Sequence, residues 1–140
     1  EFRRVLFRSE RLKTALKSFF GEDVPHIGQG GVSPAKLQDL INRWNKKEVP
    51  AIIVNPQSMS HGVDGLQEAG RAMIWHSLTY NYEDYEQLNR RLKRSGQTER
   101  VLVAHVIAEK TVDQAVMSSL RRKDKLQGNL FQALREYWEK

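Results

Sequence analysis

Residues 87–97 carry the side chains whose types and spacing are best suited to chemistry. Drawn as an α-helix, this segment places Arg91 and Arg94 within a narrow wedge centred on Gln87. Its apolar side chains fall on the opposite side, so we expect one face to be buried and a cationic face to meet a polyanion. The alternative is an ordinary surface helix, in which acidic residues come early and basic residues late, as the helix dipole favours.

Length and composition limit what the chain can be. Its 140 residues allow one domain with a real core and little more. The sequence has no cysteine, which excludes a disulfide framework, a thiolate metal site and a cysteine nucleophile, and fits an intracellular protein. No apolar run approaches the length of a membrane span, and the mean hydropathy is −0.63. A net charge of +6 and a pI near 9.7 fit a surface that faces nucleic acid, although many basic proteins bind none.

The first nine residues resemble the in-frame translation of a common short-read sequencing adapter. We therefore expect residues 1–9 to be a non-native segment, which is set aside when the fold is predicted. Removing its three Arg and one Glu from 23 basic and 17 acidic residues leaves 20 and 16, a net charge of +4. The remaining chain, which has no initiating Met, is then expected to be a truncated gene fragment.

Strand-like and helix-like segments alternate along the chain. Helical periodicity covers 10–20, the stretch after Ser33-Pro34, 82–95, and a final helix that begins at a Thr111/Gln114 capping box and continues through 138. Apolar runs predict strands at 24–27, 51–54, 72–75 and 101–108. Such alternation implies βαβ units and a parallel sheet covered on both faces, with ligands outside the carboxyl ends of the strands.

Three stretches, in the order in which they follow one another along the chain, resemble a known family. They are Ser-His-Gly-Val-Asp-Gly-Leu-Gln (60–67), Ile-Trp-His-Ser-Leu-Thr-Tyr-Asn-Tyr-Glu-Asp-Tyr-Glu-Gln (74–87) and Arg-Xaa-Xaa-Arg-Xaa-Gly-Gln (91–97). The chain resembles the second lobe of Swi/Snf-type superfamily-two helicases, with the phage and prophage branch the most similar. The resemblance implies an α/β, parallel-sheet RecA-like (P-loop NTPase-type) C-terminal lobe at 10–123, truncated at its start, with a helix at 124–140 that packs on it.

The resemblance also implies roles for the cationic segment. Arg91 and Arg94 match the two arginines of motif VI, which reach the γ-phosphate of ATP, and Arg94 is the stronger candidate for the catalytic finger. A guanidinium fork stabilises the charge that develops on phosphoryl oxygens. Gln87 and Gln97 match the glutamines that open and close this motif, which makes both nucleotide-binding candidates.

A second set of candidates lies in the loop after the strand at 51–54. Gly62 and Asp64 match the Gly-Xaa-Asp of motif V, whose acid faces the nucleotide; the alternative for Asp64 is a turn residue before glycine. Ser58, Ser60 and His61 lie in the part of motif V that faces nucleic-acid phosphates, with plain loop solvation as the alternative for the serines.

Further candidates and departures complete the comparison. Gly30 and Ser33 precede a helix N-terminus and are candidate DNA contacts. Lys93 stands where the family often has histidine, and Arg90 adds a charge where Asp or Ala is usual. Phosphate contact and a solvated face both remain open for a basic cluster late in the chain (Arg121, Arg122, Lys123 and Lys125).

The sequence also lacks parts that hydrolysis requires. It contains neither a Gly-Lys pair for a phosphate-binding loop nor an Asp-Glu box for Mg²⁺. The resemblance therefore implies that ATP and Mg²⁺ are bound mainly by an N-terminal lobe absent from this sequence, and that this fragment is inactive alone. The expected partners are double-stranded DNA, ATP and that lobe, without a membrane, in the cytoplasm of a bacterial or phage-infected cell. The alternative is a stand-alone nucleic-acid-binding or scaffold module.

Histidine and tryptophan offer no further site. The four histidines lack metal-ligand spacing, which favours structural or solvated roles and predicts no metal site. Trp44, Trp75 and Trp138 lie in apolar stripes or runs, so packing in the core is favoured over base stacking.

Overall fold

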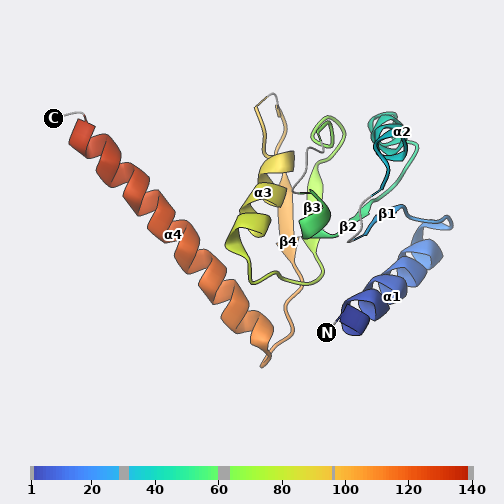
Figure 1. Cartoon of the computed structure of the whole chain (residues 1–140), viewed down its shortest axis with the longest axis horizontal. Helices are drawn as coiled ribbons and strands as arrows, with labels where there is room; N and C mark the ends of the chain where they lie inside the picture. Colours follow the sequence, from blue (N-terminus) through green and yellow to red (C-terminus); the bar gives the residue numbers. More distant parts are fainter. Residues whose placement is uncertain (1, 29–31, 60–63, 96, 139–140) are drawn as a thin grey trace.

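The computed structural model describes residues 2–28, 32–59, 64–95 and 97–138, and combines helices with short parallel strands (Figure 1). The elements, in order, are α1 (Phe2–Phe20), β1 (His26–Ile27), α2 (Pro34–Asn45), β2 (Ile53–Val54), the 3-10 helix η1 (Pro56–Met59), β3 (Ala72–Trp75), α3 (Tyr82–Leu92), β4 (Leu102–His105) and α4 (Val112–Trp138). Each predicted strand and helix has a counterpart among them. No helix in the described ranges has an apolar stretch that could cross a bilayer.

The strands pair in parallel, but they form two small sheets rather than the one that we expected. β1 pairs with β2, His26 opposite Ile53, and β3 pairs with β4, Ala72 opposite Leu102. Within the described residues no ladder joins the two pairs. The expected run at 51–54 contributes only two residues to β2, and Pro56, which has no backbone N–H, begins η1 two residues later.

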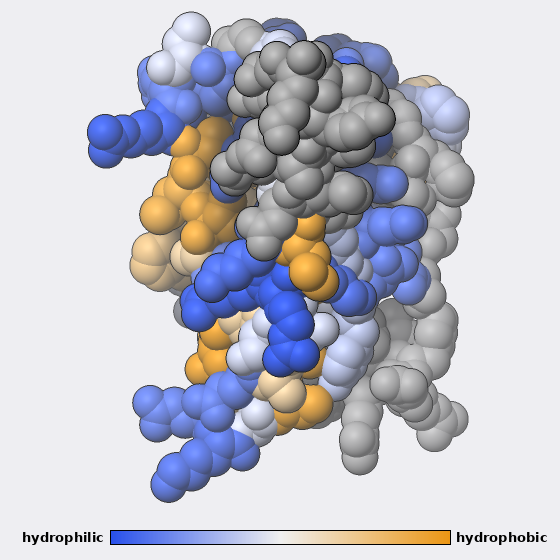
Figure 2. Space-filling view, turned by 90° about the vertical axis from the view of Figure 1, so that its left-hand side faces the viewer, coloured by the Kyte–Doolittle hydropathy of each residue, from blue (hydrophilic) through white to orange (hydrophobic). Residues whose placement is uncertain are grey.

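The expectation that helices cover both faces of the sheet is wrong for the β3–β4 pair. Ile74 and Leu102 lie on one face, because Ala72 pairs with Leu102 and alternate residues of a strand point to the same side. Their exposed fractions are 67% and 64%, whereas Trp75, on the other face, is 3% exposed. Figure 2, which views the molecule from the α4 side, shows apolar patches between hydrophilic side chains.

One hydrophobic cluster nevertheless joins the two sheets. Its buried members come from both halves of the lobe (Ile27, Leu40, Ile41, Val49, Leu66, Trp75, Leu88 and Leu92). Half-buried side chains from all of the later strands pack against it (Val54, Met73 and Val103). The packing of α2 and α3 on this core therefore holds β1–β2 and β3–β4 in one lobe.

The start of α2 follows the predicted capping. Ser33 is the N-cap, and its hydroxyl oxygen accepts a hydrogen bond from the backbone N–H of Lys36 at 3.4 Å, with Pro34 as the first helical residue. Trp44, near the end of the helix, packs against the core and donates its indole N–H to the carbonyl of Leu66 at 3.0 Å. The predicted core role of Trp44 and Trp75 is confirmed, while the side chain of Trp138 lies outside the described part.

The last helix is continuous from Val112 to Trp138, as its periodicity predicted. Its start differs from a capping box: Thr111 accepts from the N–H of Asp113 at 3.3 Å, but the Gln114 side chain accepts from Lys110 instead of from Thr111. Val116 and Leu120 pack against Tyr82 of α3, after which the helix extends away from the lobe in Figure 1.

Candidate functional site

Helix α3 is the scaffold of the candidate site. Asn81 caps its start by accepting a hydrogen bond from the N–H of Glu83 at 3.0 Å, and the acidic residues of the first turn suit the positive end of the helix dipole. Tyr82, Leu88 and Leu92 are buried, which fixes the rotation of the helix about its axis. The opposite face, which carries Gln87, Arg90 and Arg91, therefore points outward.

The helix ends earlier than predicted. We expected helix through residue 95, but it ends at Leu92, and Lys93 leaves the helical region with φ −87° and ψ 60°. Arg94 therefore lies in the turn after α3 and not on its face. The cause is tertiary: Leu92 is 6% exposed and is the last apolar side chain that the core accepts from this helix. Gly96, the predicted stop, lies outside the described residues.

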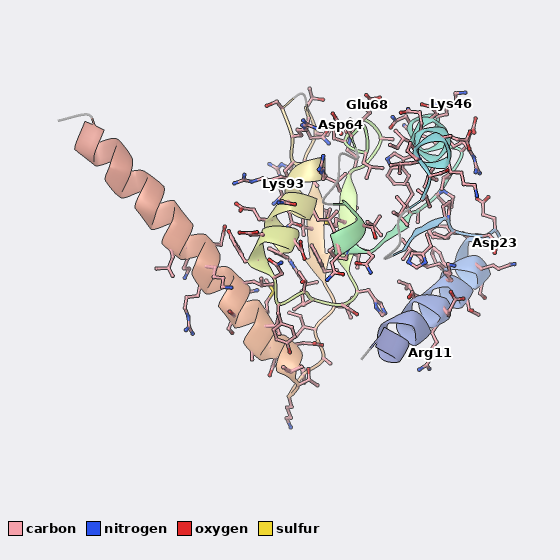
Figure 3. The ribbon with its side chains drawn as sticks, viewed as in Figure 1. Arg11, Asp23, Lys46, Asp64, Glu68 and Lys93 are labelled. Atoms are coloured by element: carbon pink, nitrogen blue, oxygen red, sulfur yellow. The ribbon has the colours of Figure 1, made fainter. Side chains whose placement is uncertain are left out.

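The turn still brings the two candidate arginines together. Arg91 and Arg94 line one open depression of about 440 Å³, and the remaining lining residues are Gln87, Arg90, Lys93 and Ser95. Lys93, just after α3, is exposed, and Figure 3 shows it in the same upper part of the lobe as Asp64. Four cationic side chains in one concave surface are suited to an anion with several oxygens.

Arg94 has a specific partner within the lobe. Its Nη1 donates a hydrogen bond to Oδ1 of Asp64, so the loop after β2 and the turn after α3 meet through an ion pair. The same carboxylate accepts from the backbone N–H of Gly65 at 2.9 Å and from the Gln67 amide at 3.3 Å. The hydrogen bond from the Gly65 N–H makes the largest contribution to lowering the pKa of Asp64, and the positive charge of Arg94 lowers it further. Asp64 is therefore a charged partner of Arg94.

Asp64 also occupies the turn before Gly65 that was the alternative interpretation of this residue. Gly65 follows with φ +98°, a conformation that favours glycine, and its N–H binds the preceding carboxylate. The side chains of Arg94 and Asp64 are 47% and 60% exposed, so their ion pair adds little to the stability of the fold. The turn fixes where the carboxylate lies, and Arg94 meets it there.

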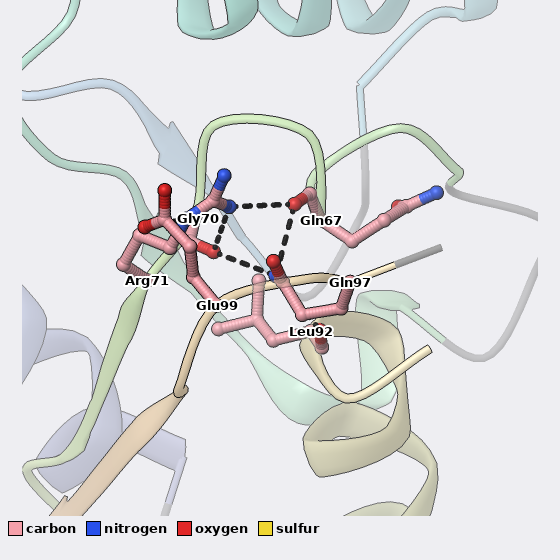
Figure 4. Close-up of polar contacts among 6 residues, drawn as sticks. All are labelled: Gln67, Gly70, Arg71, Leu92, Gln97 and Glu99. Carbon is pink, nitrogen blue, oxygen red and sulfur yellow. Dashed lines mark hydrogen bonds and ion pairs between the residues drawn. The ribbon is translucent and has the colours of Figure 1, made fainter. Parts of the chain in front are cut away.

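Gln97 connects three backbone segments beneath the site. Its Nε2 lies 3.1 Å from the carbonyl oxygen of Gln67 and 3.3 Å from those of Gly70 and Leu92 (Figure 4). Although we expected a nucleotide contact, this structure directs the amide nitrogen into the lobe. The turn that carries Arg94 is thereby attached to the segment before β3.

Arg71 strengthens the same junction and was not singled out from the sequence. Its Nη1 donates to the carbonyls of Gln67 and Gly70, both at 3.0 Å, and its Nε binds Glu99 at 2.8 Å (Figure 4). Residues 71 and 99 are far apart in the chain and belong to no motif. Only the parallel pairing of β3 with β4, which places their starts side by side, brings them together.

A polar and aromatic cluster fixes the inner face of α3. Trp75 donates its indole N–H to Asn89 at 3.0 Å, and its ring lies 5.0 Å from that of Tyr85. The Tyr85 hydroxyl lies 2.8 Å from Nε2 of His105. Burial lowers the pKa of His105, and the positive charges of Arg121 and Lys93 lower it further. The histidine thus serves as an uncharged structural partner near neutral pH.

The candidate nucleic-acid contacts are only partly described. The Ser58 hydroxyl donates to the carbonyl of Gly28, which joins the segments that follow β1 and β2. Ser33 uses its hydroxyl oxygen to cap α2. Gly30, Ser60, His61 and Gly62 lie outside the described residues. The structure therefore places Ser58 at the carboxyl ends of the first strand pair and Ser33 at the start of α2.

Comparisons with known proteins agree with this architecture. The fold is similar to the crystal structure of the C-terminal part of the Fun30 ATPase domain, with a TM-score of 0.64 and 20% identity over 83% of this chain and 36% of that one. The sequence is 28% identical over 108 residues to the p41 protein of Acyrthosiphon pisum secondary endosymbiont phage 1, covering 74% of this chain. No protein-family model matches.

Both relatives are much longer than the matched region. The chain spans 22% of the length of the phage protein and 36% of the Fun30 chain. At this level of identity, the Fun30 comparison establishes the fold: a mixed α/β unit with small parallel sheets, like the C-terminal part of the Fun30 ATPase domain. The phage protein shows that a related sequence occurs in a phage.

Proposed function

We propose that the chain is the C-terminal motor lobe of an ATP-dependent DNA helicase or translocase of the Swi/Snf type, and that it is inactive alone. The observation that carries the proposal is the meeting of Asp64 with Arg94. These residues come from the two segments that resemble motifs V and VI, and they lie 30 positions apart in the sequence. The likeness to the C-terminal part of the Fun30 ATPase domain supports the same function.

In the proposed parent enzyme, Arg94 is the arginine finger and Arg91 is its second cation. ATP and Mg²⁺ would be held mainly by the N-terminal lobe, where ATP would supply the phosphoryl group and Mg²⁺ would neutralise part of its charge. This chain brings guanidinium groups to the γ-phosphate from the opposite side, where they stabilise the charge that develops on the transferring oxygens. Hydrolysis then depends on closure of the cleft between the lobes.

The other candidates position these arginines or hold the ligands. Gln87 lines the same depression as both arginines, so its amide is placed to bind the nucleotide. Gly62 and Asp64 would face the ribose, and Gln97 keeps the turn of Arg94 attached to the lobe. Ser58 and Ser33, with Gly30, Ser60 and His61, would contact the phosphates of duplex DNA, and contacts of that kind position a protein without reading sequence.

The test uses the two-lobe parent enzyme. Arg94→Ala should lower DNA-stimulated ATP turnover by at least ~10³-fold, the scale of arginine fingers, while DNA binding stays nearly intact. Arg43→Ala is the matched control, because Arg43 also forms an exposed ion pair, with Glu48, but lies on α2. Near-normal turnover in Arg94→Ala would refute the assignment. A parent gene without a phosphate-binding lysine upstream of residue 10 would favour a nucleic-acid-binding module instead.

A further inference from the structure

Side-chain contacts extend the parallel register of β3 and β4 to residues that precede both strands. The ladder pairs Ala72 with Leu102. The same separation, 30 residues, recurs before the strands, where the Gln97 amide donates to the carbonyl of Gln67. Arg71 lies between these two contacts, and its own carbonyl accepts a hydrogen bond from the N–H of Leu102 at 2.9 Å. The two segments therefore stay in register from the sheet towards the turn that carries the candidate finger.

Arg71 binds both of these segments through its side chain (Figure 4). Its Nη1 donates to the carbonyl oxygens of Gln67 and Gly70, both at 3.0 Å, and its Nε donates to Glu99 at 2.8 Å. We infer that Arg71 is a positioning residue for Arg94, because it ties the loop before β3 to the segment that follows the Arg94 turn. The inference rests on the proposed function, in which Arg94 is the catalytic finger.

Gln97 connects this attachment to the backbone of Arg94. Its N–H donates to the carbonyl of Arg94 at 3.0 Å, and its Nε2 lies 3.1 and 3.3 Å from the two carbonyl oxygens that Arg71 binds. Each of those oxygens accepts from both side chains, so both of its lone pairs are used. The guanidinium of Arg71 therefore fixes the two oxygens to which the Gln97 amide binds, and through that amide the turn of Arg94.

Loss of the Arg71 guanidinium should affect the turn more than the stability of the fold. The side chains of Arg71 and Glu99 are 36% and 65% exposed, and an ion pair of this kind adds little to the free energy of unfolding. Both carbonyl oxygens would keep one donor, the Gln97 amide. A catalytic group is more sensitive, because a displacement of about 1 Å can cost on the order of 10²-fold in rate. A weakly stabilising contact can therefore control turnover.

The first measurement uses this chain alone. Arg71→Met keeps an aliphatic side chain and removes every donor, so the midpoint of thermal unfolding should fall by no more than about 3 °C. Amide hydrogen exchange in residues 93–97 should accelerate by about threefold to tenfold, the scale of one hydrogen bond. Glu99→Gln should have a smaller effect of the same sign, because its amide oxygen still accepts from Nε of Arg71.

Arg43→Met is the matched control for this measurement. Arg43 also forms an exposed ion pair, with Glu48, but it lies on α2, and its substitution should leave exchange in residues 93–97 unchanged. Unchanged exchange in Arg71→Met would overturn the inference. A large loss of thermal stability in that variant would assign Arg71 to the fold as a whole, and would overturn the inference equally.

The second measurement uses the two-lobe parent enzyme. Arg71→Met should lower kcat for DNA-stimulated ATP hydrolysis by about tenfold or more. KM for ATP should change by less than about twofold, because a finger acts on charge that develops in the transition state. In an Arg94→Ala parent, the same substitution should cause no further loss, because the group that it positions is gone. A purely structural role would lower turnover equally in both backgrounds, and that result would overturn the inference.

The inference and the proposed function fail in different ways. If the Arg94→Ala parent is inactive while the Arg71→Met parent has normal turnover, only the inference is overturned. If exchange in residues 93–97 accelerates in Arg71→Met while the Arg94→Ala parent stays active, the proposed function fails, and Arg71 still positions the turn.

Discussion

The Tyr85 hydroxyl and Nε2 of His105 lie 2.8 Å apart, and this hydrogen bond joins α3 to the end of β4. It links the helix that carries the candidate site to the sheet beneath it. The pKa of His105 is lowered from 6.5 by burial and by the positive charges of Arg121 and Lys93, so the folded lobe favours the uncharged ring.

We therefore predict that stability falls when the pH falls below the ordinary pKa of histidine. Between that value, 6.5, and the lower folded value, the unfolded chain binds more protons than the folded one, so the free energy of unfolding decreases as pH falls. His105→Gln should make this decrease smaller, as measured by urea unfolding at pH 7.5 and 5.5. His26, whose pKa is also lowered by burial, contributes a dependence of the same sign.

The control for that experiment is His76→Gln, because His76 is exposed after β3. Its pH dependence should match that of the unmodified chain. An unchanged slope in His105→Gln would mean that burial and the charges of Arg121 and Lys93 do not disfavour the charged ring.

Substitution of Gly70 should destabilise the lobe. A Cβ at this position would lie 2.6 Å from Cδ2 of Leu92 and 2.7 Å from the carbonyl oxygen of Leu66, and the carbonyl belongs to the backbone and cannot move cheaply. Gly70→Ala should therefore lower the free energy of unfolding by about 1–3 kcal/mol, the usual cost of overpacking. Urea denaturation measures this change.

Gly128→Ala provides the contrasting variant. Its Cβ would meet nothing within 4 Å, and it lies inside α4, where alanine is favoured over glycine by about 0.5–1 kcal/mol. The helix content in circular dichroism should rise or stay equal. Equal effects of the two substitutions would contradict the close approach that the structure gives Gly70.

Replacement of the Gln97 amide should loosen the turn of Arg94. Gln97→Glu removes the donor that reaches Gln67, Gly70 and Leu92, and leaving carbonyls unpaired beside a carboxylate should cost about 1–3 kcal/mol. Amide hydrogen exchange should accelerate in residues 92–97. Gln38→Glu is the control, because that amide binds Asn42 on an exposed face of α2, and there the exchange of residues 92–97 should stay unchanged.

Local signals in the sequence predicted the elements well. Ser33 and Pro34 mark the start of α2 because capping and a fixed φ act within one turn of the chain. The apolar run at 72–75 became β3 at its predicted bounds. The predicted end of α3 was wrong. Leu92 is the last side chain of the helix that packs in the core, and its carbonyl accepts a hydrogen bond from the Gln97 amide of the next segment.

The candidate site depends on contacts that local patterns do not contain. The spacing of Arg91 and Arg94 indicated that they would lie together, and they line one depression, although by way of a turn instead of a helix face. The pairing of Asp64 with Arg94 and the junction of Arg71 with Glu99 each join distant segments. Such pairs arise from strand pairing and core packing, which a single sequence specifies only through the whole fold.

The two parallel strand pairs also have a consequence for the rate at which the lobe forms. His26 pairs with Ile53 and Ala72 with Leu102, so each ladder closes a loop of roughly 30 residues before its hydrogen bonds form. Parallel pairing admits no tight hairpin that could nucleate quickly. Folding should therefore be slower than in a helical bundle of equal length, because these strand pairs join residues that are distant in the sequence. A newly made chain would expose its strand edges during that interval, when pairing with another chain competes with folding.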